Sequence, residues 1–346
     1  MRAVVLRGPR VVELVDIDPP ALLPGSVLVA VERCGVADTD LESFEIGSVP
    51  APAWFGHEWS GSVVEIGDGV AGHFVGERVV GAVPPPCGSC RTCRAGFGDH
   101  CELVVDMIVG ADELASGHGA FAEWVRVDAR RLRPIPESID DADATLIEPA
   151  AVAARAIDRA RLSLGGLVAV IGAGSIGLLS AELARLSGAG AVVVIDAHPE
   201  RRELACDLGA DAAFESYHDA RPWLASKGHG LGADAVFDCS GRVTVDVSMS
   251  ESTSLVRRGG TVVAVGVRSG PQELLSSGLI ETEIDLRASL GYRHSDVERV
   301  IGLMADDRLR VGALRESRSI GLAEFAALLA VGGRAVRTPL VAPSLI

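Results

Sequence analysis

Four cysteines lie close together in the N-terminal half of the chain and have the spacing of a metal site. The pattern C-x2-C-x2-C-x7-C joins Cys87, Cys90, Cys93 and Cys101. Four thiolates brought together by short loops suit tetrahedral zinc, and a site whose four positions are all filled by protein is structural rather than catalytic. Two disulfides are the competing interpretation, which a reducing compartment disfavours. The spacing predicts one structural zinc per chain, in a lobe over 87–101.

A glycine-rich segment in the C-terminal half has the composition of a phosphate-binding turn. The run LVAVIG (167–172) predicts a strand, and an apolar-periodic helix follows the turn. In such a turn the first glycine permits the tight bend, the second lets the backbone approach a pyrophosphate, and the third allows close helix–sheet packing. The helix start favours anions. The residues expected to contact a dinucleotide are Gly172, Gly174, Ser175, Ile176 and Gly177.

An acidic residue ends the next predicted strand. AVVVID (191–196) finishes at Asp196, nineteen residues after Gly177. A carboxylate here accepts hydrogen bonds from the adenosine ribose and repels a 2′-phosphate, which favours NAD over NADP. Arg201, which we also count as cofactor-binding, and Arg202 leave the alternative open, since either could reach a phosphate. A tight turn without a ligand is the structural alternative.

The pattern of apolar runs, glycines and prolines along the chain indicates which elements position these motifs. Up to about Glu148, short valine-rich runs alternate with glycine and proline, which is typical of an irregular, barrel-like β domain. These runs are VLVAVE (27–32), SVVEIG (62–67) and ERVVGAV (77–83).

Farther on, strands and helices alternate, which predicts an α/β fold with a parallel sheet covered on both faces. From about Gly291 a helix and a short closing segment follow, and we expect them to return to the first domain. The elements expected in this half are helices over 175–186, from Pro199, up to Gly259-Gly260 and over 296–305, and strands over 167–171, 191–196, 234–239 and 261–267.

With the glycine turn and the cysteine lobe combined, the chain resembles the zinc-containing medium-chain alcohol dehydrogenases, nearest the polyol and threonine dehydrogenase branch. The resemblance implies a GroES-like β-barrel catalytic domain over 1–150, a Rossmann doubly wound parallel sheet over 151–290 and a C-terminal segment over 291–346. It also implies a cleft between the two domains for nicotinamide and substrate. Besides the lobe and the turn, the matching segments are VERCGVADTDLE (31–42), GHEWSGSVVEIGDGV (56–70), VGERVVG (75–81), GAFAEWV (119–125) and IEPAAVAARA (147–156).

One position departs from the family pattern. In the family a catalytic zinc is held by a cysteine, by the His-Glu of the GHE motif and in some members by the Glu before Pro. His57, Glu58 and Glu148 match the last three. The family string C-G-[IV]-C-[GHR]-[ST]-D places the cysteine ligand where this chain has Ala37, followed by Asp38.

Three outcomes are open at this second metal site. The chain has lost the catalytic zinc, or Asp38 serves as an oxygen ligand, or a shifted loop recruits Cys34, which aligns with a cysteine that is ordinarily a strand residue. We favour the first outcome and expect a weak or empty site. The candidate ligands implied by the resemblance are Cys34, Asp38, His57, Glu58 and Glu148.

Catalysis can be written with or without that metal. With it, zinc would polarise the substrate oxygen and Thr39 would relay a proton during hydride transfer. Without it, His57, Glu58 and Glu148 would act as general acid–base groups, since neighbouring carboxylates raise one another's pKa. Asp40 is expected to orient His57. Each also has a structural alternative: a core hydrogen bond for the histidine, a helix cap for Glu148 and a turn hydroxyl for Thr39.

The predicted reaction is the reversible oxidation of a secondary alcohol on a polyol, sugar or cyclitol, with NAD as the hydride carrier. A zinc-free reductase of a conjugated double bond is the second candidate, because that chemistry leaves less charge on oxygen. A non-catalytic NAD-binding protein is the third. Ala37 favours this third candidate, whereas the retained His57, Glu58 and Glu148 count against it.

Composition excludes other classes of function. The net charge of −15 is spread along the chain and disfavours nucleic acid or an anionic membrane as a partner. The sequence shows neither a secretory signal nor an apolar run long enough for a membrane span. We therefore expect a cytoplasmic enzyme with a small hydroxyl-bearing substrate and, by the resemblance, a homodimer or homotetramer.

Overall fold

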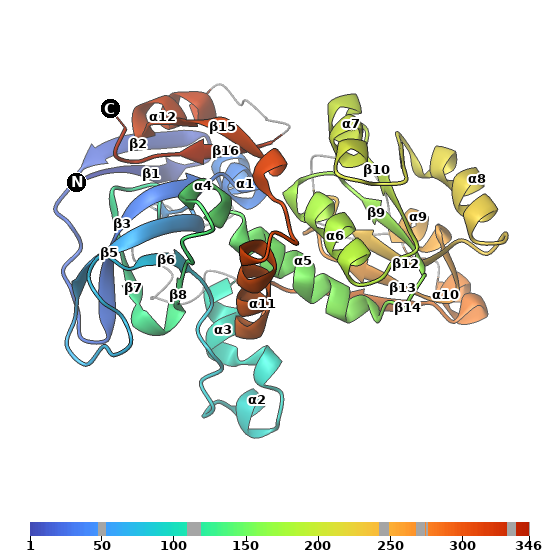
Figure 1. Ribbon diagram of the computed structural model, residues 1–346, viewed down its shortest axis with the longest axis horizontal. Coiled ribbons are helices and arrows are strands. Elements are labelled where there is room, and N and C mark those ends of the chain that lie inside the picture. Colours follow the sequence, from blue (N-terminus) through green and yellow to red (C-terminus); the bar gives the residue numbers. More distant parts are fainter. Residues whose placement is uncertain are drawn as a thin grey trace. The chain divides into compact units, whose positions relative to one another are not determined.

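The computed structural model describes residues 1–47, 53–108, 119–241, 249–267, 274, 276–330 and 337–345. The chain divides into two compact units, shown with their elements labelled in Figure 1. The first unit is Met1–Glu148 with Arg293–Ile346, and the second is Pro149–Tyr292. Among the helices described, none combines the length and the apolar character that a transmembrane span requires.

The first unit is built on two sheets of mostly antiparallel strands. One has the order β15-β16-β3-β5-β6-β8 with β7 paired to β3, and the other has the order β2-β1-β4. The strands are β1 (Arg2–Gly8), β2 (Val11–Asp16), β3 (Ser26–Gly35), β4 (Ala53–Trp54), β5 (Glu58–Ile66), β6 (Arg78–Gly81), β7 (Trp124–Asp128), β8 (Leu132–Pro134), β15 (Arg315–Ile320) and β16 (Thr338–Val341).

Short helices connect and cover these strands. They are α1 (Asp38–Ile46), α2 (Arg91–Arg94), η1 (Gly98–His100), α3 (Glu102–Ile108), η2 (Ala129–Arg131), α4 (Asp141–Ala144), α11 (His294–Ala305), η3 (Gly312–Leu314) and α12 (Leu322–Ala330).

Aromatic packing joins distant parts of the chain in this unit. The ring centroids of Phe121 and Phe325 lie 4.3 Å apart, and those of Phe55 and Phe121 lie 4.8 Å apart, edge to face. Such pairs add about 0.5–1.5 kcal/mol to the burial of their area. The closing segment also supplies β16, whose Val341 pairs with Cys34 of β3. The last helix and strand are therefore part of the same core as the N-terminal strands.

The second unit contains a six-stranded parallel sheet with the order β11-β10-β9-β12-β13-β14. Numbered within the unit, this is the doubly wound order 3-2-1-4-5-6, which confirms the predicted Rossmann sheet. The strands are β9 (Leu167–Ile171), β10 (Ala191–Ile195), β11 (Ala212–Phe214), β12 (Ala233–Asp238), β13 (Val256–Ala264) and β14 (Asp285–Ala288), and the helices are α5 (Ile147–Ala160), α6 (Ser175–Leu186), α7 (Pro199–Asp207), α8 (Tyr217–Lys227), α9 (Met249–Ser254) and α10 (Ser276–Thr282).

One predicted boundary in this unit is wrong. The helix expected to end near Gly259-Gly260 ends at Ser254, and the glycine pair lies inside β13. Gly259 has a φ of +65°. The pairing of β12 with β13 is irregular here, since it shifts register between Ala233 and Ala235. The two glycines therefore lie at an irregular point inside a strand. In the sequence, a glycine pair of this kind looks the same as one that ends a helix.

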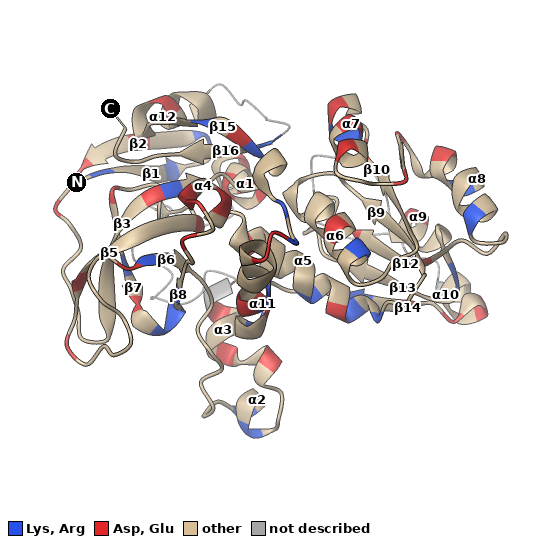
Figure 2. Ribbon diagram, viewed as in Figure 1, with Lys and Arg blue, Asp and Glu red and all other residues tan. Residues whose placement is uncertain are grey.

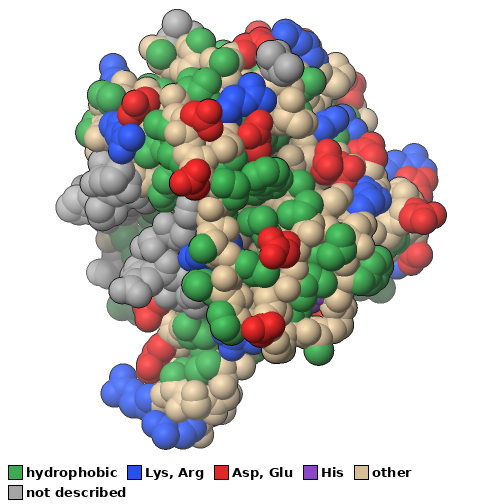
Figure 3. All heavy atoms as spheres, turned by 90° about the vertical axis from the view of Figure 1, so that its left-hand side faces the viewer, with side chains coloured by type: hydrophobic (Ala, Val, Ile, Leu, Met, Phe, Trp, Pro, Cys, Tyr) green, Lys and Arg blue, Asp and Glu red, His purple; other side chains and the backbone are tan. Residues whose placement is uncertain are grey.

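The charges of the protein are distributed as the sequence predicts. Basic and acidic residues occur on helices and loops of both units (Figure 2). On the face shown in Figure 3, apolar side chains are interspersed with charges of both signs.

Gly177 should be the glycine of the phosphate-binding turn that least tolerates a side chain. A Cβ built there would lie 1.8 Å from the carbonyl oxygen of Gly172. We expect Gly177→Ala to lower the free energy of unfolding by about 1–3 kcal/mol, as overpacking does. Gly302 is the matched control, because it lies in α11 with open space around its Cα, so Gly302→Ala should raise stability by about 1 kcal/mol. Urea unfolding of both variants checks this, and an unchanged midpoint for Gly177→Ala would contradict it.

Candidate functional site

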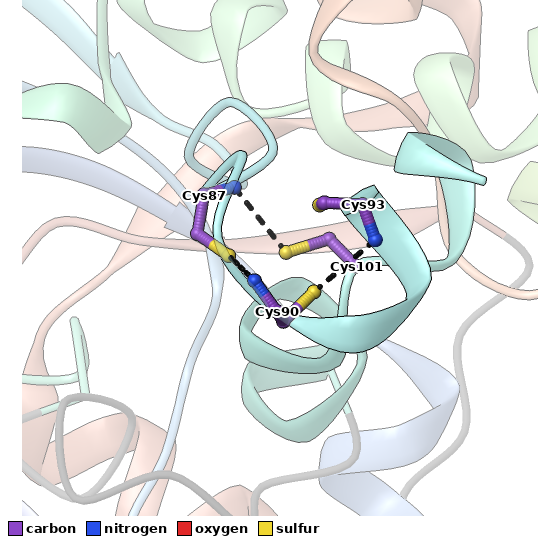
Figure 4. A group of neighbouring side chains, drawn as sticks. All are labelled: Cys87, Cys90, Cys93 and Cys101. Carbon is purple, nitrogen blue, oxygen red and sulfur yellow. Dashed lines mark hydrogen bonds between the residues drawn. The ribbon is translucent and has the colours of Figure 1, made fainter. Parts of the chain in front are cut away.

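The four cysteines of the lobe form one cluster (Figure 4). Their sulfur atoms all lie within 4.8 Å of one another, and all four are free cysteines. Cys90 is the N-cap of α2 and Cys93 lies inside that helix, whereas Cys101 lies between η1 and α3. The short helices α2 and η1 therefore place the four cysteines close together, as their spacing in the sequence predicts.

Backbone N–H groups of the lobe point at its sulfur atoms. The N–H of Cys87 donates to Cys101 Sγ at 3.3 Å, that of Cys90 to Cys87 Sγ at 3.3 Å and that of Cys93 to Cys90 Sγ at 3.4 Å. The pKa of Cys87 is lowered by the N–H of Cys90, and the Thr92 hydroxyl with the N–H of Cys93 lowers the pKa of Cys90 to about 6.

Cys93 differs from the other thiols of the lobe. Desolvation, together with its hydrogen bond to Cys90, raises the pKa of Cys93 to about 12. A bound cation would favour its thiolate, because coordination deprotonates a thiol. Four thiolates, two of them already favoured by donors, form a complete tetrahedral set, so the lobe fits zinc.

A second cluster combines a histidine with two glutamates. His57, Glu58 and Glu148 each place one ligand atom within 4.8 Å of the others. Glu58 begins β5 and pairs with Gly35 of β3. A Cβ at Gly35 would lie 2.7 Å from Glu58 Oε2. The absence of a side chain at position 35 therefore makes room for the carboxylate.

The carboxylate of Glu58 is buried and incompletely hydrogen-bonded. The residue is only 5% exposed, and its Oε2 has no hydrogen-bond partner among the described residues. Buried polar atoms are almost always paired, so an unpaired one points to a ligand, a proton or a reactive role.

Asp40 connects this cluster to the start of α1. Its Oδ2 accepts from the N–H of Ala37 at 2.9 Å, and its Oδ1 accepts from the N–H of Gly56 at 3.3 Å. The same Oδ1 lies 3.7 Å from Nδ1 of His57. A single buried carboxylate thus joins two loops beside the imidazole, and its role in orienting His57 stays a prediction.

The electrostatics of the cluster favour protonated groups. Desolvation lowers the pKa of His57, but the nearby carboxylate of Asp40 and the charges of Glu148 and Glu58 outweigh it and raise that pKa to about 10. Because 47% of the imidazole is exposed, water screens part of this attraction. Burial raises the pKa of both Glu58 and Glu148, while positive His57 acts in the opposite direction. All three groups therefore bind a proton more tightly than they would in water.

The other predicted residues lie around this cluster. Ala37 is buried at the N-cap of α1, and Asp38 and Thr39 are exposed in its first turn. Cys34 is fully buried in β3, where its thiol donates to the carbonyl of Gly35 at 3.6 Å. Burial, followed by the charges of Asp40 and Glu58, raises its pKa, which keeps the thiol protonated. Neither Cys34 nor Asp38 belongs to the clusters found in the described part of the chain.

The histidine–glutamate cluster does not fit a tightly held zinc. As far as the chain is described, its donors are one imidazole nitrogen and two carboxylate oxygens, without a thiolate. This is a harder and weaker donor set than those of protein zinc sites.

The glycine turn has the geometry of an anion site. Gly172 adopts a φ of +90°, and α6 begins at Ser175 after Gly174, which has no side chain to cap the helix. A hydrogen bond joins the turn to the end of β10, because the N–H of Ala173 donates to Asp196 Oδ2 at 2.7 Å. The N-terminus of α6 thus fits a pyrophosphate.

The structure adds a residue that the sequence reasoning missed. His198 donates to Asp196 Oδ1 from its backbone N–H and from Nδ1 of its ring, both at 2.9 Å. The predicted Arg201 also lies close, with Nη1 3.9 Å from Asp196 Oδ2. The sequence signal that could have identified it is the position of His198, two residues after Asp196.

Comparison with known proteins places the chain in a family. The alcohol dehydrogenase GroES-like domain model matches residues 23–137, and the zinc-binding dehydrogenase model matches residues 175–306. The (R,R)-butanediol dehydrogenase of Bacillus subtilis is 30% identical over 306 residues, which cover 85% of each protein. The chain belongs to the zinc-type medium-chain alcohol dehydrogenases.

Further relatives agree with this family and its fold. The sorbitol dehydrogenase of Halalkalibacterium halodurans is 30% identical over 306 residues, covering 86% of each protein. A solved structure, described as a zinc-binding dehydrogenase from Sinorhizobium meliloti 1021 bound to NADP, is 29% identical, covers 99% of each chain and has a TM-score of 0.84. As a medium-chain dehydrogenase this protein is an oxidoreductase with a GroES-like and a Rossmann domain, as the resemblance implied.

Asp40 should control the proton affinity of His57. We expect Asp40→Asn to lower the pKa of His57 from about 10 toward its ordinary 6.5, because the strongest source of its elevation is removed. Protonated His57 stabilises the fold fully below about pH 6.5, and this contribution is lost as the pH rises through about 10. NMR titration of the imidazole in the metal-free protein measures the shift. Asp38→Asn, an exposed change on the same helix turn, is the control, and equal behaviour of the two variants would refute the assignment.

Proposed function

We propose that this dehydrogenase oxidises a secondary alcohol of a polyol, sugar or cyclitol, or reduces the matching ketone, with NAD as the hydride carrier. The observation that carries the proposal is the convergence of His57, Glu58 and Glu148, three groups that can hold or release a proton, in one cluster. The relatives named for butanediol and sorbitol support the substrate class, since both compounds carry secondary hydroxyls.

Oxidation removes a hydride from the carbinol carbon and a proton from the hydroxyl. NAD, when bound, accepts the hydride. Glu148 takes the hydroxyl proton, because its raised pKa makes it a stronger base than an ordinary carboxylate. Protonated His57 donates a hydrogen bond to the substrate oxygen as negative charge develops there. Asp40 holds the imidazole, and exposed Thr39 is the remaining candidate for relaying the proton to solvent.

We assign the cofactor to the glycine turn and the acid at the end of β10. The N-terminus of α6 binds the pyrophosphate, and Asp196 disfavours the 2′-phosphate of NADP. The residues proposed for this role are Gly172, Gly174, Ser175, Ile176, Gly177, Asp196 and Arg201.

We assign one structural zinc to the cysteine lobe and no step of the reaction to a second zinc. The lobe offers four thiols whose sulfur atoms lie within 4.8 Å of one another, whereas the histidine–glutamate cluster is a weak set of three donors. The metal in the lobe would stabilise the fold of 87–101.

A zinc-free reductase of a conjugated double bond is the second candidate. It is favoured by Ala37, since conjugate reduction places less charge on the oxygen and needs less help from a Lewis acid. The same acid–base cluster would then protonate the product.

Turnover assays separate these candidates. Purified protein should form NADH from NAD⁺ with butane-2,3-diol, sorbitol or a cyclitol, and calorimetry should give a lower Kd for NAD⁺ than for NADP⁺. Glu148→Gln should lower kcat by about 100-fold or more, as loss of a general base does. Glu137→Gln, an exposed glutamate nearby in sequence, is the matched control. Enone reduction without any alcohol oxidation would establish the second candidate instead.

Metal content tests the assignment of zinc. We expect one zinc per native chain by elemental analysis, because among the residues that the structure describes only the lobe has a complete donor set. Cys93→Ser should lose most of it, whereas Cys206→Ser, an exposed cysteine outside the lobe, should keep it. Structural zinc is worth on the order of 10–16 kcal/mol in small peptides, so the Cys93 variant should also unfold more easily.

Ala37→Cys extends the same measurement to the second site. The new thiolate would join His57, Glu58 and Glu148, and zinc content should rise to two per chain. Activity of the native protein that survives chelation would support acid–base catalysis by side chains. Two tightly bound zincs in the native protein would show that our assignment is wrong.

A further inference from the structure

The carboxylate of Asp196 accepts three hydrogen bonds from the protein itself. The residue is 0% exposed. Its Oδ2 accepts from the N–H of Ala173, and its Oδ1 accepts from both the N–H and the ring of His198. To accept a hydrogen bond from a ribose hydroxyl, a carboxylate must have a free lone pair. To repel a phosphate, its negative charge must not be compensated by a neighbouring positive group. Both functions are weakened here by the His198 ring.

Basic side chains surround this carboxylate. His198 lies 2.9 Å from Oδ1 through Nδ1, and Arg201 Nη1 lies 3.9 Å from Oδ2. Arg202 Nη1 donates to the carbonyl oxygens of Asp196 at 2.8 Å and Ala197 at 2.9 Å. Three potentially cationic side chains thus lie within one helix turn of the acid, at the start of α7.

The local fold does not explain a histidine at position 198. It is the N-cap of α7, where Ser, Thr, Asp or Asn would stabilise the helix best. Within the described residues its side chain makes no capping hydrogen bond and is instead turned to Asp196. With 51% of its side chain exposed, the ring remains accessible to a ligand.

We propose that His198 is a cofactor-specificity residue that weakens the rejection of NADP by Asp196. Because Nδ1 already donates to Asp196, the ring in its imidazolium form compensates the buried carboxylate and offers Nε2–H as a donor to a 2′-phosphate, next to Arg201 and Arg202. The chain therefore binds NADP within a modest factor of NAD. This inference rests on the dinucleotide role of the site proposed above.

Binding titrations of His198→Ala test the proposal without relying on turnover. Calorimetry with NAD⁺ and with NADP⁺ gives the ratio of the two Kd values. We expect His198→Ala to raise the ratio of the NADP⁺ to the NAD⁺ value about tenfold over the native protein, as loss of a charge-assisted hydrogen bond does. NAD⁺ should bind as tightly as before or tighter, because Asp196 regains a free lone pair.

Two further variants separate specificity from folding. His198→Asn keeps an N–H donor for Asp196 but not the ring, and its ratio should lie between those of the native protein and His198→Ala. His218→Ala, an exposed histidine on α8, should leave the ratio unchanged. An unchanged ratio in His198→Ala, or an equal loss of both cofactors, overturns the proposal while the function stands. Failure of the native protein to bind either cofactor overturns both.

Discussion

Burial of carboxylates is the constraint on which the histidine–glutamate cluster and the glycine turn both depend. An ion withdrawn from water costs several kcal/mol unless donors or opposite charges surround it. Asp40 meets that requirement with the N–H groups of Ala37 and Gly56, and Asp196 meets it with Ala173 and His198. In each case one donor is local, from Ala37 or His198, and the other comes from a loop farther along the chain, Gly56 or Ala173. The hydrogen bonds that compensate the charge therefore also hold two segments of the chain together.

Glu58 is the exception among these carboxylates, and it lies in the cluster to which we assign the acid–base chemistry. One of its oxygens lacks a donor within the part of the chain that is described, although the residue is buried. The neighbouring positive group is His57, and Glu148 adds repulsion. A thiolate at position 37 would add a further negative charge, which a dication would have to balance. With alanine there, protons and the imidazolium can balance the remaining carboxylates, which is why acid–base chemistry is the simplest use of this cluster.

The sequence predicted best what depends on local spacing. The helix over 175–186 has the predicted bounds, and the four cysteines meet because at most seven residues separate consecutive members. The fold class followed from alternating strands and helices. The bend at Gly259-Gly260 was mistaken for a helix end, since a glycine pair serves either purpose and only the pairing with β12 decides.

What depends on strand register could not be predicted. The position of Glu58 opposite Gly35, and of Cys34 inside the core, results from the pairing of β3 with β5 and β16, and spacing alone does not specify such partners. The resemblance supplied the identities of these residues but not the burial that determines their proton affinity.

The buried carboxylates of Asp196 and Glu58 also show how the same need for compensating donors leads to different chemistry. At Asp196 the protein completes the donor set of a buried carboxylate with a histidine, and the expected consequence is a weaker preference between cofactors, because a compensated charge repels a phosphate less. At Glu58 the donor set is left incomplete, and the consequence is a group ready to exchange a proton. One residue at each site, His198 in the first case and Ala37 in the second, determines how the charge of the neighbouring carboxylates is balanced. Neither residue lies in the interior of a strand that builds the two sheets, so specificity and mechanism rest on positions at the ends of those strands.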